Sequence, residues 1–175
     1  MFLFPTVFIV LVLLYVASVY NTFQTTSTRI EAAIQEIGNQ LKRQASLIPN
    51  LEASVKGYLK HEKDIFGMLT DARKNVDRAV ADTSGKSLDK VEKSLTELSG
   101  KLQILVESNP QIQANTTVSS FMDELRDTAD KLMYSRRSVI DLTQQYNQML
   151  VTVPTNLIAN MFGFALTQGD CGYSF

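Results

Sequence analysis

Residues 41–62 read LKRQASLIPNLEASVKGYLKHE, and the fold of the chain depends on how this stretch is built. Apolar residues recur in it at steps of three and four, which is the spacing of one face of a helix. Pro49 interrupts that spacing, and a proline inside a helix removes a backbone hydrogen bond and costs about 3 kcal/mol unless packing compensates. The stretch is therefore either a kinked helix or a turn between two helices.

The same spacing extends outward from this stretch in both directions, from Ile30 to Ala79, and only Gln44 and Glu62 interrupt its apolar character. The phase of the repeat does not change across Pro49, whereas a loop usually resets the phase. We therefore predict one nearly continuous helix over residues 24–81, kinked near residue 49. Gln44, Asn50 or a water molecule is expected to satisfy the carbonyl oxygen that the proline leaves free. Gly57 and Gly67 either are tolerated in this helix or mark a close approach between helices.

Two further apolar repeats predict helices over residues 87–107 and 117–151. Residues 82–87 have turn composition, with Ser87 as a candidate N-cap, and residues 111–117 are expected to form a loop before a cap at Thr117 or Ser119. Steps of three and four average about 3.5 residues, the repeat of helices packed at a shallow angle. The predicted fold class is all-α, a long antiparallel helical bundle or coiled coil.

The N-terminal segment has no charged side chain before Arg29, and residues 1–23 are mostly apolar with aromatic residues at both ends. About 20 such residues span the hydrocarbon core of a bilayer. We therefore divide the chain into a transmembrane helix (1–23), a helical body (24–153), and a short helix with a tail (154–175). A cleaved signal peptide is the alternative, although Val16-Ala17-Ser18 is a poor cleavage site and no basic residue precedes the apolar run.

The predicted localisation is a single-pass membrane protein. Arg29, Lys42 and Arg43 follow the apolar segment, and basic residues favour the cytoplasmic side of a span. We expect the body in the cytoplasm and a short amino terminus outside. If the segment is a signal peptide instead, the body is exported.

The composition excludes several kinds of site. The 17 basic and 18 acidic residues nearly cancel, so we expect no nucleic-acid partner. One Cys and one His cannot form a disulfide or a zinc cluster. The pair His61-Glu62 lacks the second histidine of a zinc protease motif. Glu62 falls on the apolar face, where a structural ion pair with Lys56, Arg73, Arg136 or Arg137 is favoured over a reactive acid. We expect no cofactor, no metal, no small-molecule substrate and no catalytic residue.

Several short motifs, in order and at matching separations, make the chain resemble the LemA family as a divergent member. They are Tyr20-Asn21, Leu41-Lys42-Arg43, Leu47-Ile48-Pro49-Asn50-Leu51, Val55-Lys56-Gly57-Tyr58, His61-Glu62, Ala72-Arg73, Glu107 with Pro110, Ala114-Asn115, Arg136-Arg137, Tyr146-Asn147, Pro154-Thr155-Asn156-Leu157-Ile158-Ala159 and Phe162-Gly163-Phe164. The resemblance implies an N-terminal membrane helix and a long antiparallel helical body, as in bacterial proteins without an assigned biochemical role. It implies no catalytic residues. The chain departs from the family at Ser46, Asn109, Ala129 and Val139-Ile140 and after Phe164.

The predicted function is a membrane-anchored helical scaffold that presents helix faces to a protein partner or to copies of itself. The candidate structural and interaction residues are Pro49, Asn50, Gly57, His61, Glu62, Arg73, Arg136, Arg137, Tyr146 and Asn147. Residues 156–166 are apolar enough for a short helix that either caps the bundle or binds an interface or a partner. The alternatives are an enzyme accessory or hydrolase that uses Glu62, and a secreted or virion structural protein after signal cleavage.

Overall fold

The computed structural model describes residues 3–57 and 63–166, and within these residues the chain forms six helices and no strand. The helices are α1 (Leu3–Val55), α2 (Lys63–Ala81), α3 (Gly85–Ser108), α4 (Pro110–Gln113), α5 (Thr116–Val151) and α6 (Thr155–Phe162). The fold is all-helical, as the apolar repeats predict.

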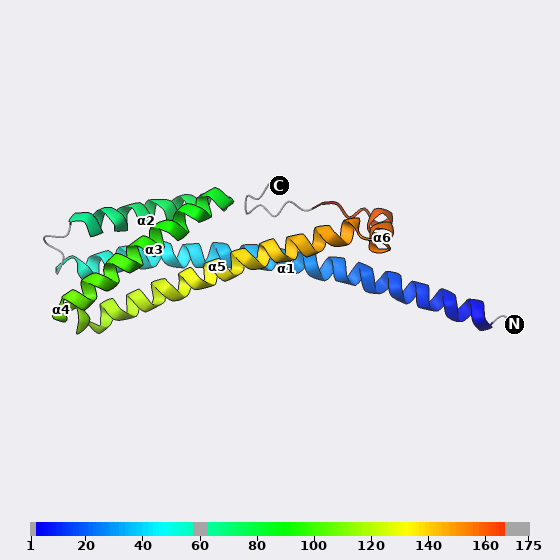
Figure 1. Ribbon diagram of the computed structural model, residues 1–175, viewed down its shortest axis with the longest axis horizontal. Helices are drawn as coiled ribbons and strands as arrows, with labels where there is room; N and C mark the ends of the chain where they lie inside the picture. Colours follow the sequence, from blue (N-terminus) through cyan, green and yellow to red (C-terminus); the bar gives the residue numbers. More distant parts are fainter. Residues whose placement is uncertain (1–2, 58–62, 167–175) are drawn as a thin grey trace.

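The two longest helices, α1 and α5, run side by side in opposite directions (Figure 1). Arg43 pairs with Glu124 near one end of this contact, and Phe23 packs on Tyr146 near the other. The C-terminal half of α1 also contacts α2, and α2 contacts α3. The N-terminal part of α1 projects beyond the other helices as a bare extension (Figure 1).

The predicted single helix over residues 24–81 is wrong. α1 continues through Pro49 but ends at Val55, Lys56 and Gly57 form a turn, and α2 then lies back along α1 (Figure 1). The residues between the two helices, 56–62, number seven, because α1 ends at 55 and α2 begins at 63. Seven residues are one full repeat of the apolar pattern, so the chain reverses without a change of phase.

The other helix ends lie close to the expected ones, but their caps differ. α3 and α5 begin one or two residues before the expected 87 and 117, and end at Ser108 and Val151. Asn115, rather than Thr117 or Ser119, caps α5, since its side chain accepts hydrogen bonds from the backbone N–H groups of residues 117 and 118. The helical turn α4, which begins at Pro110, extends into the expected loop 111–117, and its Ile112 is buried.

The turn before α3 is organised by Asp82 rather than by Ser87. Ser84 occupies the N-cap position, and its backbone N–H and hydroxyl both donate to the Asp82 carboxylate, at 3.1 and 2.9 Å. The Ser87 hydroxyl donates to the same carboxylate at 3.2 Å. Because these donors stabilise the ionised form, they hold the pKa of Asp82 below its ordinary value.

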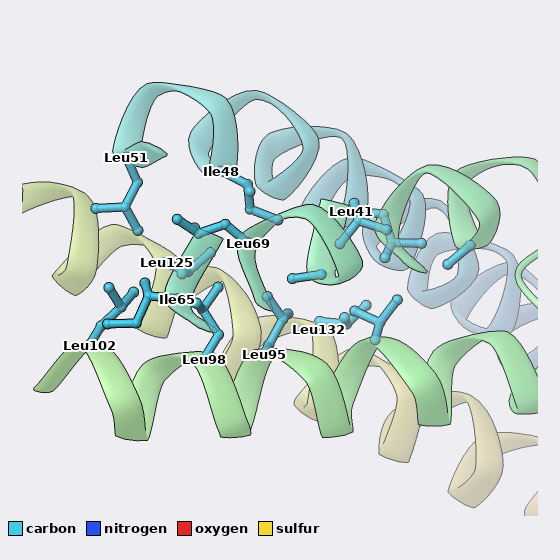
Figure 2. Packing of buried hydrophobic residues seen from close by; sticks show 14 of the residues in the cluster. Leu41, Ile48, Leu51, Ile65, Leu69, Leu95, Leu98, Leu102, Leu125 and Leu132 are labelled. Carbon is cyan, nitrogen blue, oxygen red and sulfur yellow. The ribbon is translucent and has the colours of Figure 1, made fainter. Parts of the chain in front are cut away.

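Side chains from α1, α2, α3 and α5 converge on one apolar core, which we call the body core (Figure 2). Leu41, Ile48 and Leu51 point into it from α1, and they meet leucines and isoleucines of the other three helices (Figure 2). The labelled partners are Ile65, Leu69, Leu95, Leu98, Leu102, Leu125 and Leu132. The predicted apolar faces of residues 30–55 and 65–79 are thus the faces that α1 and α2 turn toward each other and toward α3 and α5.

The structure decides between alternatives that the sequence leaves open around Pro49 and at Gly57 and Gly67. Gln44 is fully buried, and among the described residues neither of its amide atoms has a hydrogen-bond partner, so it does not satisfy the carbonyl freed by Pro49. A Cβ atom added at Gly57 or Gly67 would meet no described atom within 4 Å other than those of its chain neighbours or of its own helix backbone. These glycines therefore mark no close approach between described helices.

The predicted boundary at residue 23 falls inside α1, which runs without a break from its apolar N-terminal part into the body. α1 is the one helix in the described residues that is long and apolar enough to cross a membrane. Its large side chains from Phe4 to Tyr15 are exposed along the whole extension. Length, composition and exposure therefore make this part of α1 a candidate membrane span.

Candidate functional site

A second apolar cluster forms where α1, α5 and α6 meet, and we call it the junction cluster. Its buried residues are Val19, Phe23, Ile30, Tyr146, Ile158 and Ala159. The half-buried Ile34 packs against both this cluster and the body core, and α6 lies where the bare extension of α1 begins (Figure 1). This position makes the junction the part of the described structure where the body and the candidate span meet.

Aromatic rings hold α6 against α1 at the junction. The ring of Phe23 stacks on Phe164 with centroids 4.6 Å apart and an interplanar angle of 16°. It also meets the edge of Tyr146 at 5.4 Å. Tyr20 contacts both Phe162 and Phe164, at 5.0 and 5.7 Å. Such pairs add about 0.5–1.5 kcal/mol each to the burial of their area.

The backbone at both ends of α6 sets this geometry. The Thr155 hydroxyl donates to the carbonyl oxygens of Met149 and Thr152, at 2.6 and 2.8 Å, which ties the start of α6 to the end of α5. Gly163 ends α6 in the left-handed region, with φ of 74°. The N–H of Phe164 then reaches back to the carbonyl of Ala159 at 2.9 Å, as in the common glycine-terminated helix end. Phe164 is thereby brought onto Phe23.

On the side of α6, the junction presents large apolar side chains to solvent. One face of α6 is buried through Ile158 and Ala159. The other face and its flanking segments present six large apolar side chains to solvent, which we call the apolar shelf: Val151, Val153, Leu157, Met161, Phe162 and Leu166. Isolated exposed apolar residues are ordinary, but contiguous groups mark interaction surfaces.

Of the predicted interaction residues, Tyr146 belongs to the junction and Asn147 lies half-buried beside it in sequence. The structure does not bring the other predicted residues here. The sequence pattern that could have identified the junction is the absence of charge in residues 1–28 and 142–169, at both ends of the body.

Arg136 takes part in a different structure, an ion-pair cluster between α5 and α3. Its side chain is only 6% exposed, and its guanidinium donates to Asp89 at 2.5 Å and to Glu92 at 3.1 Å. Its acidic partners therefore come from α3, one turn apart on the same helix face. The cluster joins α3 to α5, two helices that share few other contacts.

The remaining predicted residues are dispersed. Pro49 is half-buried within α1, and the carbonyl of the exposed Asn50 accepts from the Ser54 hydroxyl. Arg73 and Arg137 are exposed and lie 3.9 Å from acidic residues one turn further along their own helices. Gly57 lies in the turn after α1, and His61 and Glu62 lie outside the described residues.

No group of three or more metal-ligating side chains occurs in the part of the chain that the structure describes. A wide, shallow groove of about 560 Å³ runs along α1 where the extension meets α5. It is lined mainly by small polar side chains and one basic residue: Ser18, Asn21, Thr22, Thr25, Thr26, Arg29 and Gln145, with Leu14 and Ala17. This arrangement offers hydrogen bonds but no nucleophile–base pair of the kind that catalysis requires.

Comparison with known sequences identifies the family. No curated protein matches the chain. The sequence profile of the LemA family matches residues 33–169, which is most of the chain and includes α2 to α6 with the C-terminal part of α1. The chain therefore belongs to the LemA family.

Proposed function

We propose that the protein is a membrane-anchored helical scaffold, held by the first part of α1 and presenting its body to a protein partner or to a second copy. The observation that carries the anchor is the bare extension of α1. Its apolar side chains are exposed from Phe4 to Tyr15, whereas the same helix is packed from Val19 onward. A helix that is apolar on all sides and uncovered by its own protein is typical of a membrane span.

The continuity of α1 favours an anchor over a cleaved signal peptide. The poor cleavage site at Val16-Ala17-Ser18 lies inside α1, immediately before Val19, whose side chain is buried in the junction cluster. Cleavage there would cut a continuous helix within one turn of a packed residue. Under this proposal the mature protein keeps Met1, which mass spectrometry of the membrane-extracted protein measures directly.

Charged substitutions test the anchor. A basic residue near the centre of a span costs about 2.5–3.5 kcal/mol in insertion. We expect the pair Leu11→Arg and Val12→Arg to move the protein into the soluble fraction after alkaline carbonate extraction of membranes. The control, Ile104→Arg with Tyr134→Arg, alters two large side chains that are exposed on the body. Carbonate-resistant retention of the span variant would contradict the proposal.

We propose that the body lies on the cytoplasmic side, because Arg29, Lys42 and Arg43 follow the span. In a Cys171→Ser background, a cysteine introduced at Ile104 should resist a membrane-impermeant maleimide in intact cells and react after permeabilisation. A cysteine at Ile104 that reacts in intact cells would reverse the proposed orientation.

The scaffold role is supported by the long helix faces of the body. A photo-crosslinking amino acid in place of Tyr134, which is exposed on α5, should give discrete adducts in native membranes. A protein that stays strictly monomeric in detergent and gives no adduct from Tyr134 or Ile104 would defeat this part of the proposal.

We propose no reaction for this chain. Glu62, which the alternative enzymatic hypothesis requires, lies outside the described residues. Glu62→Gln removes the charge and keeps the shape, so a scaffold should retain its membrane attachment and its adducts unchanged in that variant. If Glu62→Gln abolished the cellular phenotype that the wild-type protein supports, while membrane attachment and crosslinked adducts stayed intact, the result would favour the enzymatic hypothesis.

A further inference from the structure

We propose that the apolar shelf of α6 rests on the lipid bilayer beside the span, so that the protein contacts the membrane through two elements and not through α1 alone. This inference rests on the proposed anchoring of α1. It assigns to α6 the interfacial role of a short helix that lies in the plane of the membrane surface.

The contacts between α1 and the end of α6 set the depth of α6 relative to the proposed span. A span that begins near the start of α1, at Leu3, needs about 20 residues to cross the hydrocarbon core, and so emerges near residues 20–23. Tyr20 and Phe23 are the α1 residues whose rings contact Phe162 and Phe164. The C-terminal end of α6 is thereby fixed at the level where α1 leaves the hydrocarbon.

The distribution of charged residues along α1 and α5 favours the same placement of α6. The first charged residue on α1 is Arg29, the last on α5 is Asp141, and residues 142–169 contain none. Arg29 and Gln145 line the same groove, and Ile30 and Tyr146 share the junction cluster. The charge-free parts of α1 and α5 therefore start at the same level, and everything described beyond that level, including α6, lacks charge.

The direction in which the apolar side chains of α6 face also favours a lipid contact. α6 buries Ile158 and Ala159 against the junction and exposes Leu157 and Met161, at 65% and 68% of their surface. A surface for a soluble partner normally has a polar and charged rim. Residues 3–28 and 142–166, which carry and flank this surface, contain no charged side chain, and Phe162 contacts Tyr20 next to the bare extension of α1, so lipid is the occupant that the two apolar surfaces share.

The experiment measures depth with the full chain in vesicles of phosphatidylcholine and phosphatidylglycerol. In a Cys171→Ser background, single substitutions Leu157→Cys and Met161→Cys carry an environment-sensitive fluorophore. Leu11→Cys reports on the span and Ile104→Cys, on the exposed surface of the body, serves as the aqueous control. Each label is quenched separately by aqueous iodide and by lipids with a nitroxide near the headgroup or near the acyl end, and circular dichroism checks that each variant is folded.

We expect the labels at positions 157 and 161 to lose fluorescence to the shallow nitroxide more than to the deep one, and to resist iodide relative to the label at 104. Iodide quenching at 157 and 161 equal to that at 104, with lipid quenching retained at 11, would overturn the shelf and leave the anchor intact. Protection of 157 and 161 from both quenchers would also overturn it, because a protein surface would then cover α6. A label at 11 that no lipid nitroxide quenches would overturn the anchor and the shelf together.

Discussion

At the scale of single residues, Gln44 is a polar side chain in an otherwise apolar face. It is fully buried on α1, and no described residue hydrogen-bonds its amide atoms. Leaving such a group unsatisfied costs about 1–3 kcal/mol. We expect Gln44→Leu to raise the free energy of unfolding by about 1–2 kcal/mol, measured by urea unfolding in detergent. The exposed Gln144→Leu on α5 is the control and should change little. Destabilisation by Gln44→Leu would show that the amide is satisfied, for example by a buried water molecule.

Arg136 makes an asymmetric prediction, because it is buried while its partners are accessible. The side chains of Asp89 and Glu92 are 60% and 42% exposed, against 6% for Arg136. The double substitution Asp89→Ala with Glu92→Ala removes both carboxylates from a buried cation. It should lower the free energy of unfolding by roughly 3 kcal/mol.

Arg136→Met should lower the free energy of unfolding by less than the double substitution Asp89→Ala with Glu92→Ala, because water can hydrate the two carboxylates that remain. Urea unfolding of the two variants, with the exposed Glu97→Ala on α3 as control, measures the difference. The reverse order of the two effects would mean that packing of the Arg136 side chain, rather than its charge, dominates at this position.

At the scale of helices, the glycines separate into two kinds. Gly38, Gly67 and Gly100 lie inside helices, and an added Cβ would meet no described atom within 4 Å outside its chain neighbours and its own helix backbone. Each change to Ala should therefore stabilise the fold by about 0.5–1 kcal/mol. Gly163 differs because its φ is 74°. Gly163→Ala should be destabilising and should free the end of α6, which limited chymotrypsin digestion at Phe162 and Phe164 detects. Equal effects at all four positions would contradict this reading of Gly163.

Much of the helical pattern follows from the sequence, because burial in long helices repeats with a fixed period. The buried positions of α2 and α3, for example Leu69 and Leu98, are those that the apolar repeats identify. The reversal after Val55 could not be predicted from that period, since seven residues between helices preserve the phase. Residues 41–62 contain both features: Pro49 is accommodated inside α1, and the helix ends six residues later.

The candidate site was only partly predictable. Tyr146 is among the predicted interaction residues, and residues 156–166 are predicted to form a short helix that caps the bundle or binds an interface or a partner, but the contact of Phe23 with Tyr146 and Phe164 is not predicted. Which face of a short apolar helix is covered depends on the neighbour it meets, and residues 19–23 and 158–164 are distant in sequence. The two segments without charged residues, 1–28 and 142–169, are consistent with this contact. Composition alone, however, does not predict that two segments distant in the sequence pack together.

At the scale of the molecule, the two apolar clusters should respond separately to mutation. Leu98→Ala removes a fully buried side chain from the body core and should lower the stability of the whole body by about 2–5 kcal/mol. Phe23→Ala removes the ring that joins α1, α5 and α6 at the junction. In the Phe23→Ala variant, protease should cleave α6 at a much lower urea concentration than in the wild-type protein, while the main unfolding transition stays nearly unchanged. Coincident loss of both signals in the two variants would show that the clusters unfold as one unit.

The unbroken course of α1 through residue 23 has a mechanical consequence. Under the proposed anchoring, a rigid helix would give the body no swivel at the membrane, so the angle of the span among lipids or other spans would also set the direction in which the body faces. Each residue of a helix turns by about 100° and rises about 1.5 Å. One alanine inserted between residues 12 and 13 would rotate the whole body about the membrane normal relative to the start of the span. Any partner held in the same bilayer would then meet a different face of the body, although no residue of that face had changed.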